Sequence, residues 1–446
     1  MSKPNIIFIL SDQQRYDTLG CYGQELNVTP NLDKMTKEGV LFTHAFTNQP
    51  LCGPARSILQ TGKYATDTMC YRNGIALPIS DKNIANYLSN KGYESAYIGK
   101  WHLASTILAS KEDVGKKFDY SIEPVPLELR GGYNDYWLAS DLLEFTSHAY
   151  EGHLFDREEK KVEFKGYRVD CITDYALDYL RNRNGAKPFL LFISYLEPHQ
   201  QNDLNKVEGP LGSKKEFKDY KVPEDLKEMK GDWAENYPDY LGCCKSIDEN
   251  VGRILNVLKE LNIEDNTVIF YCSDHGCHFR TRTWEYKRDC HEASIHIPLI
   301  IKGPGFRGGK QISELVSLIN IAPTIMECAG IEIPIHMRGR SLQELINGNT
   351  QDWPQEVYIQ ISETQVGRAI RTKKWKYSMK APHKNGFLHA FADKYKGEYL
   401  YDLENDIYEK QNLINDSRYA NIKADLTEIL KKKMVEVGEK VPQILP

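Results

Sequence analysis

The 446-residue sequence lacks any apolar run of the roughly 20 residues needed to span a membrane. Its first apolar run, residues 5–10, is also too short for a secretory signal segment with a cleavage site. As given, the chain is therefore predicted to be cytoplasmic, and periplasmic if a signal segment was removed. We expect no membrane among its partners.

The sequence also lacks an excess of charge of one sign. It contains 57 Lys and Arg residues against 62 Asp and Glu residues, for a net charge of -5. This balance gives no general attraction to nucleic acids or to anionic membranes, so we expect no nucleic-acid partner. An anionic ligand has to be attracted by a local site.

Densely spaced cysteines are a third absence. The ten cysteines are spread along the chain, and none are arranged as Cys-x2-Cys or at zinc-finger spacing. We therefore expect reduced, mostly buried thiols and no structural zinc site. Internal repeats and low-complexity linkers are missing too, which favours one large core with a smaller unit packed tightly on it.

Four apolar runs are predicted strands, each followed by a polar cluster. Because ligands bind at the carboxyl ends of strands in open α/β sheets, we expect these clusters to converge on one crevice. With intervening helices predicted near 30–38, 169–181 and 247–261, the fold class is α/β, with a large, mixed, mostly parallel sheet flanked by helices. The runs are 5–10, 94–98, 189–194 and 267–272, and their clusters contain Asp12, Lys100 with His102, His199, and Asp274 with His275.

The pattern changes near residue 340, so we predict a catalytic α/β domain over 1–340 and a small C-terminal α+β unit over 341–446. The second unit is expected to hold a small antiparallel sheet and a terminal helix. Two segments, about 105–165 and 201–236, are predicted to be irregular excursions, the first lying over the active face. The expected C-terminal strands lie near 356–360, 367–371, 374–378 and 398–403, before a helix near 421–435.

Cys52 lies at the start of a predicted helix. Pro54 suits a first helical turn, and Gly62 suits the residue after the last one. Unpaired N–H groups and the positive end of the helix dipole favour an anion or a thiolate at this position. Arg56, one turn further on, is placed to hold a nucleophile or an oxyanion by forked hydrogen bonds. A lone cysteine would more often be a core residue, but this combination favours a function.

Asp12 and Asp274 are candidate ligands for a divalent cation. Either carboxylate alone would more often cap a turn, but each follows a buried strand, which favours a shared metal site. The oxygen of Gln13 and a nitrogen of His275 would complete the ligand shell.

The motif Cys52-x-Pro54-x-Arg56-x4-Thr61-Gly62 resembles the signature of the formylglycine-dependent sulfatases, in the alkaline-phosphatase-like superfamily. Further matches in the same order are Gly99-Lys100-Trp101-His102, Ser273-Asp274-His275-Gly276 and the C-terminal Tyr401-Asp402-Leu403. The resemblance implies that a formylglycine-generating or sulfatase-maturing enzyme oxidises Cys52 to an aldehyde.

The resemblance also implies roles for individual residues. Lys100 and Lys287 would hold the sulfate group, and His199 would protonate the leaving alcohol. Arg280, Arg282 and Trp284 could read a sulfated sugar, although a solvated loop is an equal alternative. The implied catalytic residues are Cys52, Arg56, His102 and His199, and the implied metal ligands are Asp12, Gln13, Cys52, Asp274 and His275.

Two departures from the family pattern bear on the metal and the substrate. Many members carry two adjacent aspartates where this chain has Asp12-Gln13, and asparagine is common at the position of His275. Ca²⁺ is the expected ion, but the nitrogen ligand keeps Mn²⁺ and Zn²⁺ open.

The predicted reaction is hydrolysis of a sulfate ester, with a small sulfated saccharide as the expected substrate. Hydrolysis of phosphonate monoesters or phosphodiesters is one alternative, because relatives with that activity share Asp-Gln after the first strand. A catalytically idle protein that binds sulfated glycans, in which Cys52 stays a thiol, is another. The sequence carries no signal for the oligomeric state.

Overall fold

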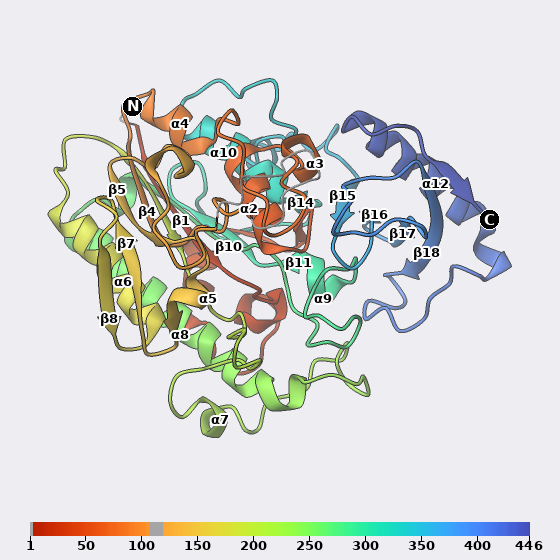
Figure 1. The fold of residues 1–446 in the computed structure, drawn as a ribbon, viewed down its shortest axis with the longest axis horizontal. Helices are drawn as coiled ribbons and strands as arrows, with labels where there is room; N and C mark the ends of the chain where they lie inside the picture. Colours follow the sequence, from red (N-terminus) through yellow and green to blue (C-terminus); the bar gives the residue numbers. More distant parts are fainter. Residues whose placement is uncertain (1–2, 107–118) are drawn as a thin grey trace.

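The computed structural model describes residues 3–106 and 119–446 (Figure 1). Its central sheet is built on four adjacent parallel strands, in the order β10, β1, β9 and β4. These are the four predicted strands, so the expected α/β core is confirmed. Because neighbouring strands run in parallel, their carboxyl ends meet at one edge of the sheet. The bounds are β1 Asn5–Ser11, β4 Glu94–Lys100, β9 Phe189–Ser194 and β10 Thr267–Ser273.

Shorter strands extend the sheet on both sides. Beyond β10 lie β12 and β2, which pair antiparallel, and then β13, parallel to β2. Beyond β4 lies β5, in parallel, followed by the antiparallel strands β7, β6 and β8. The bounds are β2 Val40–Phe42, β5 Tyr136–Ser140, β6 Ser147–His148, β7 Glu151–Asp156, β8 Lys161–Lys165, β12 Leu299–Lys302 and β13 Lys310–Ile312.

The prediction for residues 105–165 was wrong in part, because strands β5 to β8 lie within them. Residues 105–165 were predicted to be irregular, whereas the part from residue 136 onward extends the central sheet. These strands are short and the outer ones are half exposed, so their apolar alternation is weak in sequence, and pairing with β4 and with each other stabilises them instead. The predicted segment also includes residues 107–118, which lie outside the described residues.

Helices cover both faces of the sheet (Figure 1). Alternate residues of β1 face opposite layers, so Phe8 packs toward α2, α4 and α10, and Ile9 packs toward α1, α6 and α8. The ring of Phe8 stacks on Phe192 at a centroid distance of 4.7 Å. The helix bounds are α1 Pro30–Glu38, α2 Cys52–Thr61, α4 Ile84–Ser89, α6 Arg168–Asn182, α8 Trp233–Glu260 and α10 Ile321–Cys328.

Helix α8 begins well before the predicted start near residue 247. Pro238 lies in its second turn, and because proline usually interrupts a helix, the sequence did not predict the residues before 247 to be helical. The remainder of the 201–236 excursion is a surface segment with one short helix, α7 (Ser213–Glu216).

A second sheet, at the blue end of the chain in Figure 1, has a core of its own. Strands β15 to β18 pair antiparallel as predicted, and β19, which the sequence did not indicate, adds in parallel to β18. Helix α12 packs on this sheet through Leu430 and Met434. We call residues 341–446 the C-terminal unit, and the boundary itself stays a prediction. The bounds are β15 Glu356–Ile361, β16 Gly367–Thr372, β17 Trp375–Lys380, β18 Lys394–Asp402, α12 Ala420–Glu436 and β19 Gln443–Leu445.

A buried cluster of charges joins the two parts. Lys376, on β17, is fully buried, with its Nζ atom 2.7 Å from Glu292 Oε1 and 2.6 Å from Glu409 Oε1. Arg371 gives Glu292 a second cation at 3.3 Å. Burial opposes ionisation of Glu292, but Arg371 and Lys376 hold the pKa of Glu292 well below its usual value.

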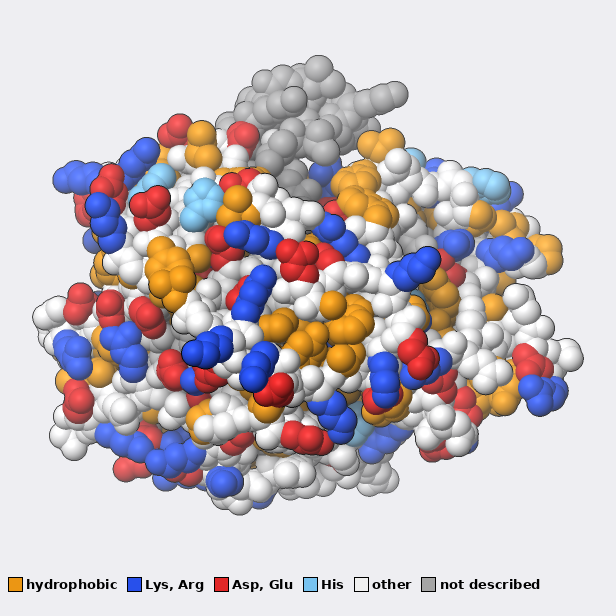
Figure 2. Space-filling model, turned by 90° about the horizontal axis from the view of Figure 1, so that it is seen from below, with side chains coloured by type: hydrophobic (Ala, Val, Ile, Leu, Met, Phe, Trp, Pro, Cys, Tyr) orange, Lys and Arg blue, Asp and Glu red, His pale blue; other side chains and the backbone are white. Residues whose placement is uncertain are grey.

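The ten cysteines are unpaired, and seven are buried, in agreement with the expected reduced thiols. Within residues 3–106 and 119–446, no helix combines the length and the apolar character needed to cross a membrane. On the face drawn in Figure 2, Lys and Arg side chains of the described residues lie among Asp and Glu side chains. This face therefore carries charges of both signs close together.

Candidate active site

The carboxyl edge of the central sheet meets the first turn of α2. Helix α2 begins at Cys52 itself, and Gly62, with a φ of 65°, closes it by donating to the carbonyl of Ile58. The N–H of Gly53 has no partner within the helix, and Asn73 Oδ1 accepts from it at 2.9 Å. Cys52 is 1% exposed, so its sulfur lies inside the protein.

Four buried side chains gather their donor atoms at this point. One ligand atom from each of Asp12, Cys52, Asp274 and His275 lies within 4.8 Å of the others. The Sγ atom of Cys52 is 3.5 Å from Asp12 Oδ1 and 3.3 Å from His275 Nε2. We call these four residues the donor cluster. The convergence expected from the strand ends is therefore present.

The donor cluster fits a divalent cation. His275 donates through Nδ1 to the carbonyl of Gly276 at 3.0 Å, which leaves Nε2 free to accept a metal. Asp274 Oδ2 is buried without a hydrogen-bond partner, although Arg56 Nε lies 3.5 Å away. A buried carboxylate oxygen without a hydrogen bond is costly unless a cation binds it.

Gln13 stands at the edge of this cluster with a φ of 71°. Its Oε1 atom accepts from Lys287 Nζ at 2.9 Å, and its backbone carbonyl accepts from the hydroxyl of Tyr240. Both oxygen atoms of Gln13 therefore bond to protein groups, and its role as a metal ligand stays a prediction.

Three cations surround the cluster. Lys287 Nζ lies 3.1 Å from Cys52 Sγ, and Lys100 Nζ lies 2.9 Å from Asp12 Oδ2. Arg56 Nη2 contacts the same Asp12 oxygen at 3.1 Å. All three side chains are buried. Such an arrangement can stabilise a tetrahedral anion in a region of low dielectric.

These charges set the ionisation of the site. Burial opposes ionisation of Cys52, but Lys287, Lys100 and His275 outweigh it, so the pKa of this thiol lies well below its usual value. Elsewhere burial dominates and raises the pKa of Cys70 to about 12.

The two carboxylates of the cluster are shifted in opposite directions. Burial and Cys52 act to raise the pKa of Asp12, but Lys100, His199 and Lys287 lower it below its usual value. Burial and the neighbouring Asp12 raise the pKa of Asp274. A cation between them would remove this repulsion.

The two predicted catalytic histidines lie near the cluster, His102 beside Cys52 and His199 close enough to Asp12 to affect its charge. His102 has a φ of 57°, and its Nδ1 atom is buried without a hydrogen-bond partner. His199 donates through Nδ1 to the carbonyl of Gln200 at 2.6 Å, so Nε2 is the nitrogen left to exchange a proton. Burial opposes ionisation of Glu144, but Lys100 first and then these two histidines hold the pKa of its carboxyl below the usual value.

The three residues predicted to bind a sulfated sugar contact protein groups in this structure. Trp284 is 64% exposed, and the guanidinium of Arg288 lies 5.6 Å from its ring. Arg282 donates to the carbonyls of Tyr408 and Glu409, and Arg280 lies over the ring of Tyr286. The role of all three stays a prediction.

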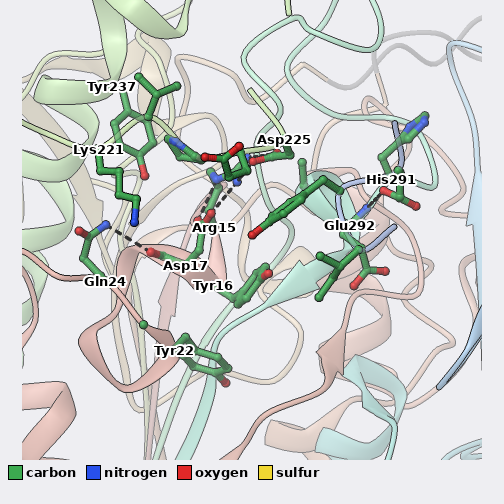
Figure 3. Close-up of a pocket in the computed structure, with 18 of the residues that line it drawn as sticks. Arg15, Tyr16, Asp17, Tyr22, Gln24, Lys221, Asp225, Tyr237, His291 and Glu292 are labelled. Atoms are coloured by element: carbon green, nitrogen blue, oxygen red, sulfur yellow. Dashed lines mark hydrogen bonds and ion pairs between the residues drawn. The ribbon is translucent and has the colours of Figure 1, made fainter. Parts of the chain in front are cut away.

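Arg282 also lines a separate polar cavity of about 250 Å³ (Figure 3). Arg15 lines this cavity too and is held by Asp17 and Asp225. No residue of the donor cluster lines it.

Sequence reasoning missed several residues of the site. Glu144 accepts from Lys100 at 3.1 Å, but it lies in the segment predicted to be irregular. Ser194 accepts from Arg56 Nη1 at 2.7 Å. Its position at the end of β9, beside the other polar strand ends, is a signal that could have found it. Asn73, which accepts from the N–H of Gly53, carried no such signal.

Comparisons with known proteins agree with this geometry. The family model described as "Sulfatase" matches residues 4–331, and that of "N-sulphoglucosamine sulphohydrolase, C-terminal" matches residues 281–436. An ulvan-active sulfatase of Formosa agariphila is 29% identical over 98% of this chain and 82% of its own length. An N-acetylglucosamine-6-O-sulfatase of Bacteroides thetaiotaomicron is 26% identical, over 99% and 88%.

A solved structure of a putative sulfatase from Bacteroides fragilis superposes with a TM-score of 0.82 and 26% identity, covering 98% of this chain and 97% of that one. Neither the phosphonate-ester alternative nor the idle-binding alternative is favoured by these relatives. A family model that matches most of the chain, on a fold with the donor cluster at its sheet edge, leads to one conclusion: this chain belongs to the sulfatase family, within the alkaline-phosphatase-like superfamily.

Proposed function

We propose that this protein removes sulfate from a sulfated saccharide, with residue 52 as the nucleophile after oxidation of Cys52 to formylglycine. The observation that carries the proposal is the contact of Cys52 Sγ with Lys287 Nζ at 3.1 Å beside two buried aspartates. Addition of water to the aldehyde would give a geminal diol, and one of its hydroxyl oxygens would take the place of this sulfur. A maturing enzyme is the partner that the oxidation requires.

Asp12, Cys52, Asp274 and His275 are the residues that would hold the metal. Ca²⁺ is the ion we propose, because two carboxylates and an oxygen at residue 52 are hard donors, and Mn²⁺ is the alternative that the imidazole of His275 would accept. When bound, the cation would neutralise charge on the sulfate oxygens and favour ionisation of the hydroxyl at residue 52.

The cationic side chains account for binding of the transferred group. Lys100 and Lys287 would each donate to a sulfate oxygen, and Arg56 would hold the oxygen of residue 52 in line with the sulfur atom. Arg56 is itself fixed by the carbonyl of Lys100 at 2.8 Å and by Ser194. Positive charge placed before the reaction begins stabilises the transition state without reorganisation.

The two histidines would move the protons. One ionised hydroxyl of the hydrated residue 52 would bond to sulfur as the bond from sulfur to the ester oxygen breaks, and His199, protonated at Nε2, would give its proton to that oxygen as the alcohol leaves. His102, whose side chain lies within hydrogen-bonding reach of Cys52, would take the proton of the remaining hydroxyl as the bond from carbon to the sulfated oxygen breaks, which releases sulfate and restores the aldehyde.

The saccharide part of the proposal has separate support. Two of the relatives that cover nearly the whole chain are named an ulvan-active sulfatase and an N-acetylglucosamine-6-O-sulfatase. The C-terminal residues match a model named for N-sulphoglucosamine. We therefore propose a hexosamine sulfate as the first substrate to test.

The test is a desulfation screen over defined sulfated saccharides, using protein whose Cys52 peptide has been shown by mass spectrometry to carry the aldehyde. We expect release of inorganic sulfate from at least one hexosamine sulfate and none from the Cys52→Ala variant. Faster turnover of an aryl phosphonate monoester than of every sulfate ester would contradict the proposal.

A further inference from the structure

Glu363, two residues after β15 in the C-terminal unit, contacts two segments that lead into the active site. Its side chain is 3% exposed, with Oε2 3.1 Å from Arg288 Nη1. Its other oxygen, Oε1, accepts from the backbone N–H of Asn73 at 2.9 Å. Arg288 directly follows Lys287, and Asn73 caps Gly53, which directly follows Cys52. The carboxylate of Glu363 thus connects the start of α2, through Asn73, to the loop that carries Lys287.

The backbone is strained at both ends of this contact. Arg288 and Glu363 have φ values of 79° and 64°, in the left-handed region that non-glycine residues seldom adopt. Gln13 and His102, at the centre of the site, share this feature with φ values of 71° and 57°. Such strain persists only where the surrounding structure fixes it.

Neighbouring contacts fix the same junction. The hydroxyl of Thr364 donates to the carbonyl of Arg288 at 2.6 Å. On the other side, Gln49 Nε2 donates to Ser362 Oγ at 2.8 Å. In Figure 1, β15 lies on the side of the C-terminal sheet that faces α2, and the N–H of Gln360 on β15 donates to the carbonyl of Asn48 at 2.8 Å. The three consecutive residues 362–364 therefore hold two segments that both lead into the site.

We propose that Glu363 is a positioning residue, which holds the start of α2 and the Lys287 loop at the separation that places Lys287 Nζ against residue 52. The catalytic part of this proposal rests on the proposed function, whereas the structural part does not. If Glu363 has this role, the C-terminal unit helps to position residues of the active site. Glu363 acts through Asn73 and Arg288 rather than by touching the reacting atoms.

The first experiment measures backbone hydrogen exchange by mass spectrometry in the Glu363→Ala protein. Peptides that cover the start of α2 and residues 282–292 are expected to exchange faster than in the unmodified chain, whereas β9 peptides are expected to be unchanged. Glu398→Ala is the matched control, because Glu398 is also nearly buried and ion-paired, 2.9 Å from Lys380, within the C-terminal unit. Equal exchange in the Glu363→Ala variant and in the unmodified chain at both segments would overturn the proposal, whether or not the protein hydrolyses sulfate esters.

The second experiment measures turnover of the aldehyde-bearing protein. A misplacement of about 1 Å costs on the order of a hundredfold in rate, so we expect kcat to fall by about tenfold or more in Glu363→Ala. Glu363→Gln keeps an acceptor for Asn73 and is expected to recover part of the loss. The double variant with Arg288→Ala should lose less than the sum of the two single losses, because both changes remove the same ion pair between Glu363 and Arg288.

A purely structural role for Glu363 makes a different prediction. It would lower the unfolding temperature of Glu363→Ala while leaving kcat of the folded protein and exchange at the start of α2 unchanged. That combination, or additive losses in the double variant, would refute the positioning role. If the unmodified protein shows no sulfatase activity while the exchange result holds, the proposed function fails and the structural part of this inference stands.

Discussion

Replacement of Lys376 by methionine tests whether buried charges join the two parts of the molecule. Methionine fills most of the volume of the lysine stem but removes the cation that lies 2.7 Å from Glu292 and 2.6 Å from Glu409. Breaking a buried ion pair at one partner costs about 3–5 kcal/mol, because the other charge stays buried without compensation.

We expect the lower end of this range, about 3 kcal/mol. Glu292 keeps Arg371, and Glu409 Oε2 keeps the backbone N–H of Glu292 at 2.7 Å, so neither carboxylate is left wholly without a partner. The measurement is urea unfolding followed by circular dichroism and by tryptophan fluorescence. Two probes are needed because a chain with two cores can unfold in more than one step.

Lys374 supplies the matched control from the same segment. It pairs with Glu404 at 2.7 Å, but its side chain is 45% exposed, and Lys374→Met is expected to leave the urea midpoint unchanged. Adding Glu409→Gln to Lys376→Met removes the uncompensated charge and should recover part of the lost stability. Equal midpoints for Lys374→Met and Lys376→Met would refute the reasoning.

The remaining predictions concern the site and the response to pH. Cys52→Ala should reduce sulfate release to the background rate, whereas Cys171→Ala should retain it. Lys100→Met removes one stabilising cation and should lower kcat/KM on the order of 10²–10³-fold, with stability checked by the unfolding temperature. Dialysis against a chelator should abolish turnover and Ca²⁺ should restore it, and full activity after metal removal would contradict the assigned ligands. Burial and His296 lower the pKa of His44 to about 4. The unfolded chain, with an ordinary histidine pKa of about 6.5, therefore binds this proton first as the pH falls, so stability should drop from about pH 6.5 to 4, and less steeply in His44→Gln.

The parallel core could be predicted because each central strand is apolar on both faces. Ile6, Phe8 and Leu10 meet one helical layer and Ile7 and Ile9 the other, so β1 appears in the sequence as an unbroken apolar run. The half-exposed strands β7 and β8 leave no such run. The start of α8 was missed for another reason, since Pro238 is tolerated within a helix that tertiary packing stabilises.

The site, like the fold, contains residues that the sequence could predict and residues that it could not. Asp12, Lys100 and Asp274 stand at the ends of central strands, so the topology alone brought them together. Glu144 and Glu363 enter from segments that pack over the sheet edge, and their approach depends on tertiary contacts that no local pattern encodes.

The span between contacting residues has a consequence for synthesis of the chain. Gln13 and Lys287, whose side chains bond directly, are separated by 274 positions. A ribosome-bound chain that ends before Lys287 lacks the cation closest to residue 52, however well its earlier strands have paired. The nascent protein should therefore be inert toward anionic esters until translation has passed this lysine, and a stalled-chain series would locate the length at which the first turnover occurs.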